Sequence, residues 1–305
     1  MAAYLHGFGA YLPERIVTNA ELAGRLGRTA EWIESASGIR ERRWATAETS
    51  VADLAVAAAE KCLGGAIPGM VIVASGSGAR GFPGPAAEVA VRLGTGQAPA
   101  LDLPIASAGG LFGLALAMQL TETYGPVLVV AAEKMSAMIE SAPLDPSTAI
   151  LFGDGAGAAL VSPDPGRWKL LDAVLHTDGQ FRGDLHWPGV GPLTMNGLSV
   201  ILQASRKLPA VIQEVLARQS MQAAEVGTFL LHQANLNLLT RVAKALQVPL
   251  EKMPTNVERY GNTSSASMLI AAAEWASANP TPGPVVFAAL GAGLHYGAVV
   301  ATSVF

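Results

Sequence analysis

Three polar residues lie where an extended or buried segment gives way to a helix, and their types could carry out covalent and acid–base chemistry. The first, Ser107, ends the segment 100–106 and precedes an apolar helical stretch that opens with Gly109 and Gly110. A hydroxyl there lies on a sharp turn at the positive end of a helix dipole, and the glycines leave room for a substrate carbonyl. The same pattern also fits a serine that only caps the helix. Ser107 is therefore a candidate nucleophile with a structural alternative.

Two further candidates follow later in the chain. His232 comes directly after the buried apolar run Phe229–Leu231, at the carboxyl end of a predicted strand, where open α/β sheets place their ligand crevices. Asn262 lies in a polar run ahead of an alanine-rich helix, a pattern that ordinarily signals capping. The histidine also has a structural interpretation, as a side chain satisfied by nearby carbonyl groups. The turn Gly291–Gly297 follows another buried strand and could present backbone N–H groups to an anion.

Short apolar runs and alanine- and leucine-rich stretches alternate along the chain and would position these residues. This alternation predicts a layered α/β fold in which strands are covered on both faces. A proline- and glycine-rich segment, Ser162–Arg167, divides the chain near its midpoint into two comparable sets of elements. The predicted strands are Met70–Ala74, Val127–Ala132, Ala156–Val161, Phe229–Leu231 and Val285–Leu290. The predicted helices are Val51–Leu63, Ala86–Leu93, Ala108–Tyr124, Val200–Gln219, Leu236–Leu246 and Ser265–Ser277.

Composition excludes several classes of protein. The 305 residues are 50% apolar and only 14% charged, so the chain can bury a large core and is not disordered. The net charge of −4 and the lack of a basic block argue against nucleic acid as a partner. The single cysteine, Cys62, excludes a disulfide framework and a cysteine-cluster zinc site. The apolar runs are far shorter than the roughly 20 residues that span a bilayer, and the start does not read as a secretion signal. We therefore expect a cytoplasmic protein without a membrane partner, part of whose surface a second copy covers.

The order of the motifs carries more information than any one of them. Together they resemble the thiolase superfamily, and most of all its β-ketoacyl-acyl carrier protein synthase III enzymes, over essentially the whole chain. The resemblance implies a thiolase-like α/β fold, in which two similar βαβαβαββ halves form a five-layered α-β-α-β-α arrangement. Residues 1–163 would form the half with the nucleophile, and residues 164–305 the half with the histidine and asparagine. The matching segments are Gly7–Glu14, Thr18–Asn19, Glu31–Ile33, Gly38–Arg42, Phe152–Gly157, His232–Asn235, Gly261–Ser267 and Gly291–Gly297.

The resemblance also implies roles for individual residues. Ser107 occupies the position of the family's nucleophilic cysteine, and His232 and Asn262 match the pair that holds the thioester carbonyl of a malonyl extender during decarboxylation. The backbone N–H groups of Ser107 and Gly293 would form the oxyanion hole. The substrates would be thioesters of coenzyme A or acyl carrier protein, bound by a homodimer without a metal or redox cofactor.

Three residues match the family's substrate-binding positions. Phe82 corresponds to an aromatic residue that crosses the dimer interface, Trp32 to one that stacks on the coenzyme A adenine, and Arg259 to one near the tunnel mouth.

The chain departs from the family pattern at several positions. A cysteine at a helix N-terminus ionises readily, whereas a serine hydroxyl needs a general base, for which His232 is the only candidate among the motifs. Ala36, Ser147 and Asn237 stand where relatives often carry arginine, and His295 replaces a usual threonine. These changes predict a specialised relative, for instance in secondary metabolism or starter-unit selection. A laboratory exchange of Cys for Ser would look the same at position 107.

Three functions follow from these residues. The leading hypothesis is a condensing acyltransferase that loads Ser107 and passes the acyl group to a malonyl-type thioester with loss of carbon dioxide. A second is acyl transfer to an alcohol, amine or water by a Ser–His mechanism. A third is a catalytically silent partner subunit of an active condensing enzyme.

Overall fold

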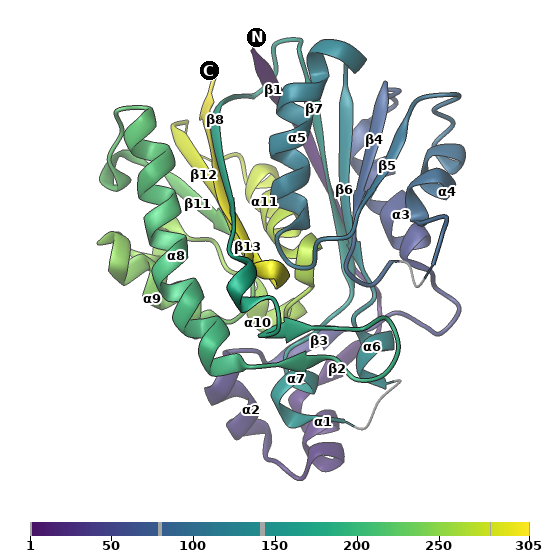
Figure 1. Cartoon of the computed structure of the whole chain (residues 1–305), viewed down its shortest axis with the longest axis vertical. Coiled ribbons are helices and arrows are strands. Elements are labelled where there is room, and N and C mark those ends of the chain that lie inside the picture. Colours follow the sequence, from purple (N-terminus) through teal and green to yellow (C-terminus); the bar gives the residue numbers. More distant parts are fainter. Residues whose placement is uncertain (1, 79–80, 141–143, 281, 305) are drawn as a thin grey trace.

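Nine strands form one continuous mixed sheet in the computed structural model, which describes residues 2–78, 81–140, 144–280 and 282–304 (Figure 1). The order across the sheet is β11-β12-β13-β8-β1-β7-β6-β4-β5. The strands that bury every residue, such as β4 and β6, carry the uninterrupted apolar runs of the sequence. The nine strands are β1 (Ala3–Tyr11), β4 (Met70–Ala74), β5 (Ala100–Leu103), β6 (Val127–Glu133), β7 (Gly155–Ser162), β8 (Trp168–Thr177), β11 (Thr228–Leu231), β12 (Pro284–Gly291) and β13 (His295–Ser303).

The sheet repeats one topology on either side of its centre. Outward from the centre, β1-β7-β6-β4 and β8-β13-β12-β11 both pair antiparallel, antiparallel and then parallel. The two halves meet where β1 pairs antiparallel with β8 at Ala3–Leu5. This repetition confirms the expected fold of two similar halves. The division of the chain at residue 163 stays a prediction.

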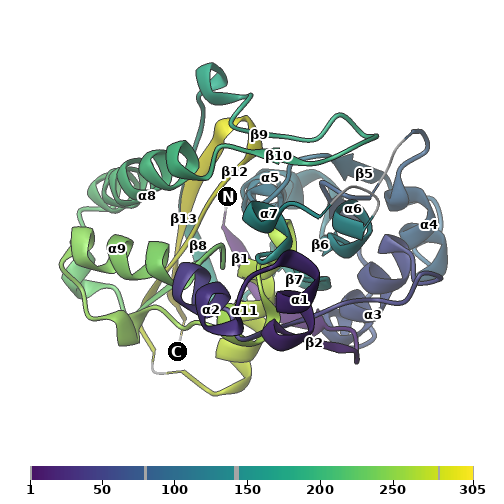
Figure 2. The ribbon, with the colours of Figure 1, turned by 90° about the horizontal axis from the view of Figure 1, so that it is seen from below.

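Helices cover both halves of the sheet and also separate them, which gives five layers. The helices α3 (Val51–Leu63) and α4 (Pro85–Arg92) cover the outer face of the first half, while α8 (Gly197–Arg218) and α9 (Leu236–Leu246) cover that of the second (Figures 1 and 2). Between the halves lie α5 (Gly109–Tyr124) and α11 (Ser267–Ser277), which belong to one buried core with strands of both halves. Both central helices are apolar around most of their circumference, as a helix enclosed on all sides must be.

Small residues let the central layer approach the sheet. A Cβ at Gly157 in β7 would lie 2.6 Å from the Cβ of Leu269 in α11, closer than real side chains pack. The sequence therefore places glycine where helix and strand backbones meet. In the part of the chain that the structure describes, no helix is both long and apolar enough to cross a bilayer.

The remaining elements gather at one end of the sheet, around the carboxyl ends of the parallel strands (Figure 1). A short ribbon of β9 and β10 extends across this end in front of α6 and α7 (Figures 1 and 2). These elements are β2 (Ile16–Thr18), α1 (Asn19–Leu26), α2 (Ala30–Ser37), β3 (Glu41–Arg43), α6 (Ser136–Glu140), α7 (Pro146–Ala149), β9 (Leu185–His186), β10 (Thr194–Met195) and α10 (Val257–Tyr260).

Candidate active site

Ser107 lies in the turn between β5 and α5, with only 6% of its surface exposed. Its φ angle of +64° is in the left-handed region, which costs a non-glycine residue on the order of 1–3 kcal/mol and is typical of functional sites. The N-cap of α5 is Ala108 and makes no side-chain capping bond, so the interpretation of Ser107 as a capping residue is wrong. The Ser107 hydroxyl has no hydrogen-bond partner among the described residues. The turn thus presents a buried, unengaged hydroxyl.

The end of β12 packs directly against this turn. A Cβ at Gly291 would lie 2.0 Å from the carbonyl oxygen of Ala106 and 2.9 Å from the Cβ of Ser107. Only a residue without a side chain fits there. The glycine-rich segment after β12 therefore supports the backbone around the candidate nucleophile.

His232 follows the carboxyl end of β11 and is 6% exposed. Its Nδ1 lies 2.6 Å from Ser267 Oγ, and the same oxygen accepts the backbone N–H of Gln233 at 3.0 Å. Because this oxygen already accepts one N–H, we assign its hydroxyl hydrogen to the bond with Nδ1 and the ring hydrogen to Nε2. Burial lowers the pKa of His232 from 6.5 to about 4, which keeps the ring neutral near pH 7. His232 is therefore a neutral hydrogen-bond donor at Nε2.

Asn262 is fixed by its backbone and by one side-chain atom. Its N–H donates to Leu151 O at 2.9 Å, and its carbonyl accepts the N–H of Gly153 at 3.1 Å. The side-chain Oδ1 accepts the N–H of Ser264 at 2.9 Å, which fixes the amide orientation because only the oxygen can accept. The Nδ2 group has no partner among the described residues. Asn262 thus offers a second donor.

One cavity brings the three candidates together. Ser107, His232 and Asn262 all line a narrow cavity of 80 Å³ whose other walls are mostly apolar, with Ile201 and Leu208 contributed by α8. Ser107 also lines a larger cavity of 290 Å³, which His232 and Asn262 do not reach. The candidate nucleophile therefore lies between a narrow channel that contains both donors and a wider chamber.

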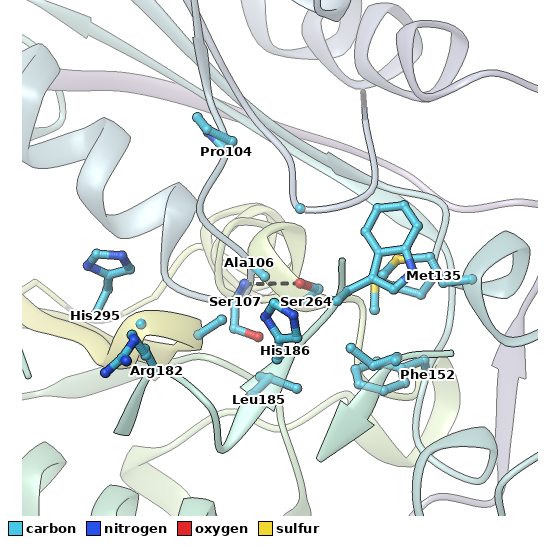
Figure 3. A pocket seen from close by; sticks show the side chains of 16 residues that line it. Pro104, Ala106, Ser107, Met135, Phe152, Arg182, Leu185, His186, Ser264 and His295 are labelled. Atoms are coloured by element: carbon cyan, nitrogen blue, oxygen red, sulfur yellow. Dashed lines mark hydrogen bonds between the residues drawn. The ribbon is translucent and has the colours of Figure 1, made fainter. Parts of the chain in front are cut away.

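The larger cavity has walls of two kinds (Figure 3). Met135 and Phe152 lie on one side of Ser107, whereas Arg182 and His295 lie on the other, and His186 is drawn beside Ser107 in this view. No aspartate or glutamate lines this cavity among the described residues. The chamber thus combines apolar walls with three basic side chains.

A buried carboxylate anchors the segment that supports Ser107. Glu133, at the end of β6, accepts hydrogen bonds from the backbone and hydroxyl of Ser265 and from the turn at Ser75–Ser77. The 3₁₀ helix Ser264–Ala266 is thereby held in place. The neighbouring Ser264 Oγ accepts the backbone N–H of Ser107 at 2.9 Å, so this expected oxyanion donor already has a partner. Gly293, the other expected oxyanion donor, lines the larger cavity.

The three predicted substrate-binding residues line neither cavity. Trp32 in α2 is 40% exposed beneath the guanidinium of Arg28, and Phe82 is 99% exposed. Arg259 forms an ion pair with Glu274 at 3.0 Å. These residues lie at the periphery of the structure rather than with the three central candidates.

Sequence reasoning missed the residues that orient the site. Ser264 and Ser267 belong to the polar run whose pattern indicates helix capping. Their hydrogen bonds to Ser107 and His232 join segments that are distant in sequence, which no local pattern shows. His186 lies on the two-residue strand β9, for which no periodic pattern exists. Among the described residues, no group of three His, Cys, Asp or Glu side chains is arranged to hold a metal ion.

Comparison with known proteins gives one consistent result. The sequence profile "3-Oxoacyl-[acyl-carrier-protein (ACP)] synthase III" matches residues 101–179, and the profile of its C-terminal region matches residues 216–303. The chain is 35% identical to the β-ketoacyl-[acyl-carrier-protein] synthase III of Geobacillus kaustophilus, over 98% of both chains.

Two solved structures extend this similarity to the fold. The 3-oxoacyl-[acyl-carrier-protein] synthase III of Aquifex aeolicus superposes with a TM-score of 0.93 at 32% identity, covering 98% of this chain and 99% of the other. The priming β-ketosynthase of the R1128 polyketide pathway superposes with a TM-score of 0.89 at 31% identity, covering 99% and 96%.

Proposed function

The chain belongs to the 3-oxoacyl-[acyl-carrier-protein] synthase III family of acyltransferases, and we propose that it transfers an acyl group from a thioester to Ser107 and condenses it with a malonyl-type thioester. The observation that carries this proposal is the pair of free donors, His232 Nε2–H and Asn262 Nδ2–H, in the cavity that contains the Ser107 hydroxyl. Both acceptor atoms of these side chains are already satisfied. The pair can therefore only donate, which suits an oxygen that gains negative charge.

Decarboxylation needs such donors. When the malonyl carboxylate leaves as carbon dioxide, its bonding electrons pass to the thioester carbonyl, whose oxygen becomes an enolate. Two donors in a buried cavity stabilise that oxygen more strongly than they stabilise the neutral carbonyl, and one such donor typically contributes a factor of about 10²–10³ to the rate. The enolate carbon then attacks the acyl carbon on Ser107, and the serine oxygen leaves and takes up one proton from water, which restores the hydroxyl.

The two cavities suggest where the substrates lie. The extender thioester must reach His232 and Asn262, so its narrow pantetheine arm would occupy the smaller, apolar cavity. The acyl group on Ser107 would then extend into the larger cavity, beside Met135 and Phe152. Ser107 lines both cavities, as a residue that exchanges acyl groups between them must.

The substituted arginine positions support a specialised enzyme with a weak hold on coenzyme A phosphates. Asn237 donates to the backbone oxygen of Ser35 at 3.2 Å, and the oxygen of Ala36 accepts Asn235 Nδ2 at 3.1 Å. Ser147 bonds to Asp145 in the cap of α7. These residues make contacts within the chain and offer no cation to a phosphate. A thioester carried by a protein is therefore the favoured donor.

A homodimer would cover the exposed edge of the sheet. The last strand, β5, pairs only with β4 and leaves Leu101 41% exposed, and Phe82, in the segment before α4, is 99% exposed. An apolar edge strand of this kind favours pairing with another chain. We include the homodimer and a contact of Phe82 with the partner subunit in this proposal, and sedimentation equilibrium tests it.

The geometry favours condensation over the two alternatives. In a Ser–His scheme for transfer to water or an alcohol, His232 Nε2 would have to accept the Ser107 proton, whereas its hydrogen bond to Ser267 makes it a donor. A silent subunit would have no use for two oriented donors beside an unengaged hydroxyl.

Intact-protein mass spectrometry tests the proposal. Incubation with acyl-coenzyme A and acyl-carrier-protein donors should give an adduct on the peptide that contains Ser107, and Ser107→Ala should give none. Malonyl-carrier protein should then release carbon dioxide and the β-ketoacyl product. An adduct without carbon dioxide release would indicate simple acyl transfer, and no adduct from any donor would indicate a silent subunit.

A further inference from the structure

A serine nucleophile needs a base that a cysteine does not. A thiol at a helix N-terminus is partly ionised near neutral pH, but a hydroxyl is far less acidic and must lose its proton as it attacks. With the Ser267 hydroxyl assigned as the donor to Nδ1, the ring hydrogen of His232 is on Nε2, so that nitrogen does not accept the proton. The base must therefore come from another residue near Ser107.

The larger cavity contains the remaining basic groups around Ser107. With no aspartate or glutamate among its described lining residues, the candidate proton acceptors are its two imidazoles, His186 and His295. His295 Nδ1 lies 2.9 Å from Thr177 Oγ1, and burial lowers the pKa of this ring. The ring of His186 has no hydrogen-bond partner among the described residues. His186 is thus the imidazole of this cavity with both ring nitrogens unengaged.

The segment that carries His186 is fixed over the cavity. His186 pairs with Thr194 across the β9–β10 ribbon, and its carbonyl accepts the Thr194 hydroxyl at 3.2 Å. On one side, the carboxylate of Asp184 accepts the hydroxyl of Ser199 in α8. On the other, Trp187 Nε1 donates to Gly191 O at 3.0 Å. A ring on a fixed ribbon that also lines the Ser107 cavity is placed to act on that residue (Figure 3).

We propose that His186 is the general base for Ser107 in acyl transfer, an inference that rests on the function proposed above. An imidazole nitrogen of His186 takes the proton from Ser107 Oγ while that oxygen forms a bond to the thioester carbon. The C–S bond then breaks, and the leaving thiolate takes the same proton back from the imidazolium. No hydrogen bond links the two side chains in the structure, so the proton moves through one water or after a rotation of the exposed ring.

A double-mutant cycle tests this role. General-base catalysis contributes about 10²–10⁴-fold, so His186→Gln should slow acylation of Ser107 by at least about 100-fold. In the Ser107→Cys background, where the nucleophile ionises by itself, the same change should alter acylation by only about twofold. His176→Gln is the matched control, because His176 pairs with Glu214 at 2.8 Å and lines neither cavity. Equal losses in the serine and cysteine backgrounds, or no loss in either, would overturn the proposal.

A second probe keeps this test separate from the proposed function. A fluorophosphonate labels a serine hydroxyl only when a base activates it and needs no thioester. Labelling of Ser107 that His186→Gln abolishes would support the base even if no thioester gave an adduct, in which case only the condensing function would fail. Labelling that survives His186→Gln, or a wild-type protein that takes no label at Ser107, would contradict the role of His186.

Discussion

Ser267→Ala should slow decarboxylation without slowing acylation of Ser107. The Ser267 hydroxyl makes two buried hydrogen bonds, one at 2.6 Å to His232 Nδ1 and one at 3.0 Å from the Gln233 N–H. The first keeps the ring hydrogen on Nε2, the donor atom of a ring that lines the narrow cavity. Without it, the neutral ring can also carry its hydrogen on Nδ1 and loses its donor in that form. Ser267 is thus a positioning residue that acts through His232.

The size of the effect follows from the bonds that are lost. A buried hydrogen bond between neutral groups contributes about 1 kcal/mol, so its loss should lower the donor form of His232 from about five-sixths to about half of the neutral ring, and carbon dioxide release should fall about twofold. The Gln233 N–H would also lack a partner, which should lower the free energy of unfolding by about 1–3 kcal/mol. Ser277→Ala is the matched control, since it removes an exposed hydroxyl at the other end of α11.

The assay measures both half-reactions on the same preparation. Carbon dioxide release from malonyl-carrier protein reports the enolate step, and mass spectrometry of the Ser107 peptide reports acylation. Urea denaturation shows that the variant is folded. If acylation and carbon dioxide release fell by the same factor, His232 would be acting as the base of Ser107 and our assignment of its ring hydrogen would be refuted.

Four further outcomes follow from the same geometry. Asn262→Ala should reduce carbon dioxide release by about 10²–10³ while acylation stays within about threefold, because only the enolate needs the Nδ2 donor. Burial lowers the pKa of His232 from 6.5 to about 4, so between these values the unfolded chain binds a proton that the folded chain does not, and stability falls as the pH drops. Between pH 7 and pH 5 the wild type should therefore lose about 2 kcal/mol more of its free energy of unfolding than His232→Gln does. Urea titrations at the two pH values measure this difference, and an equal loss in both proteins would contradict the low pKa. Ser107→Cys should raise condensation roughly tenfold in the coupled assay, because a thioester is the better acyl donor, and a slower variant would argue against nucleophile chemistry as the limit. Gly291→Ala should lower the free energy of unfolding by about 1–3 kcal/mol in urea and abolish acylation, because the new Cβ would lie 2.0 Å from Ala106 O.

The strands and helices with a uniform pattern could be predicted from the sequence. The helices α3 and α9 and the strand β4 have the predicted bounds, because each shows an uninterrupted apolar run or a clear helical period. The strands β1, β8 and β13 were not predicted, although they join the two halves of the sheet. Each mixes buried and partly exposed residues. Strands distant in sequence pair with β1 and β8 on both sides and with β13 on one side, so these structures depend on tertiary contacts that no local pattern records.

The identities of the central residues could also be predicted, but the direction of their hydrogen bonds could not. The family resemblance predicts that a histidine and an asparagine converge with Ser107, whereas their positions ahead of helical segments leave open whether they cap, accept or donate. In the structure, Asn262 Oδ1 accepts the Ser264 N–H, and Nδ2 is left free for the donor role that we propose. For His232 the deciding partner is Ser267, which is 35 residues away. With the Ser267 hydroxyl assigned as the donor in that bond, the histidine is itself a donor at Nε2, which argues against its predicted role as the base for Ser107. Chemistry at such a site depends on which atom of each side chain is already engaged, and this information enters only with the fold.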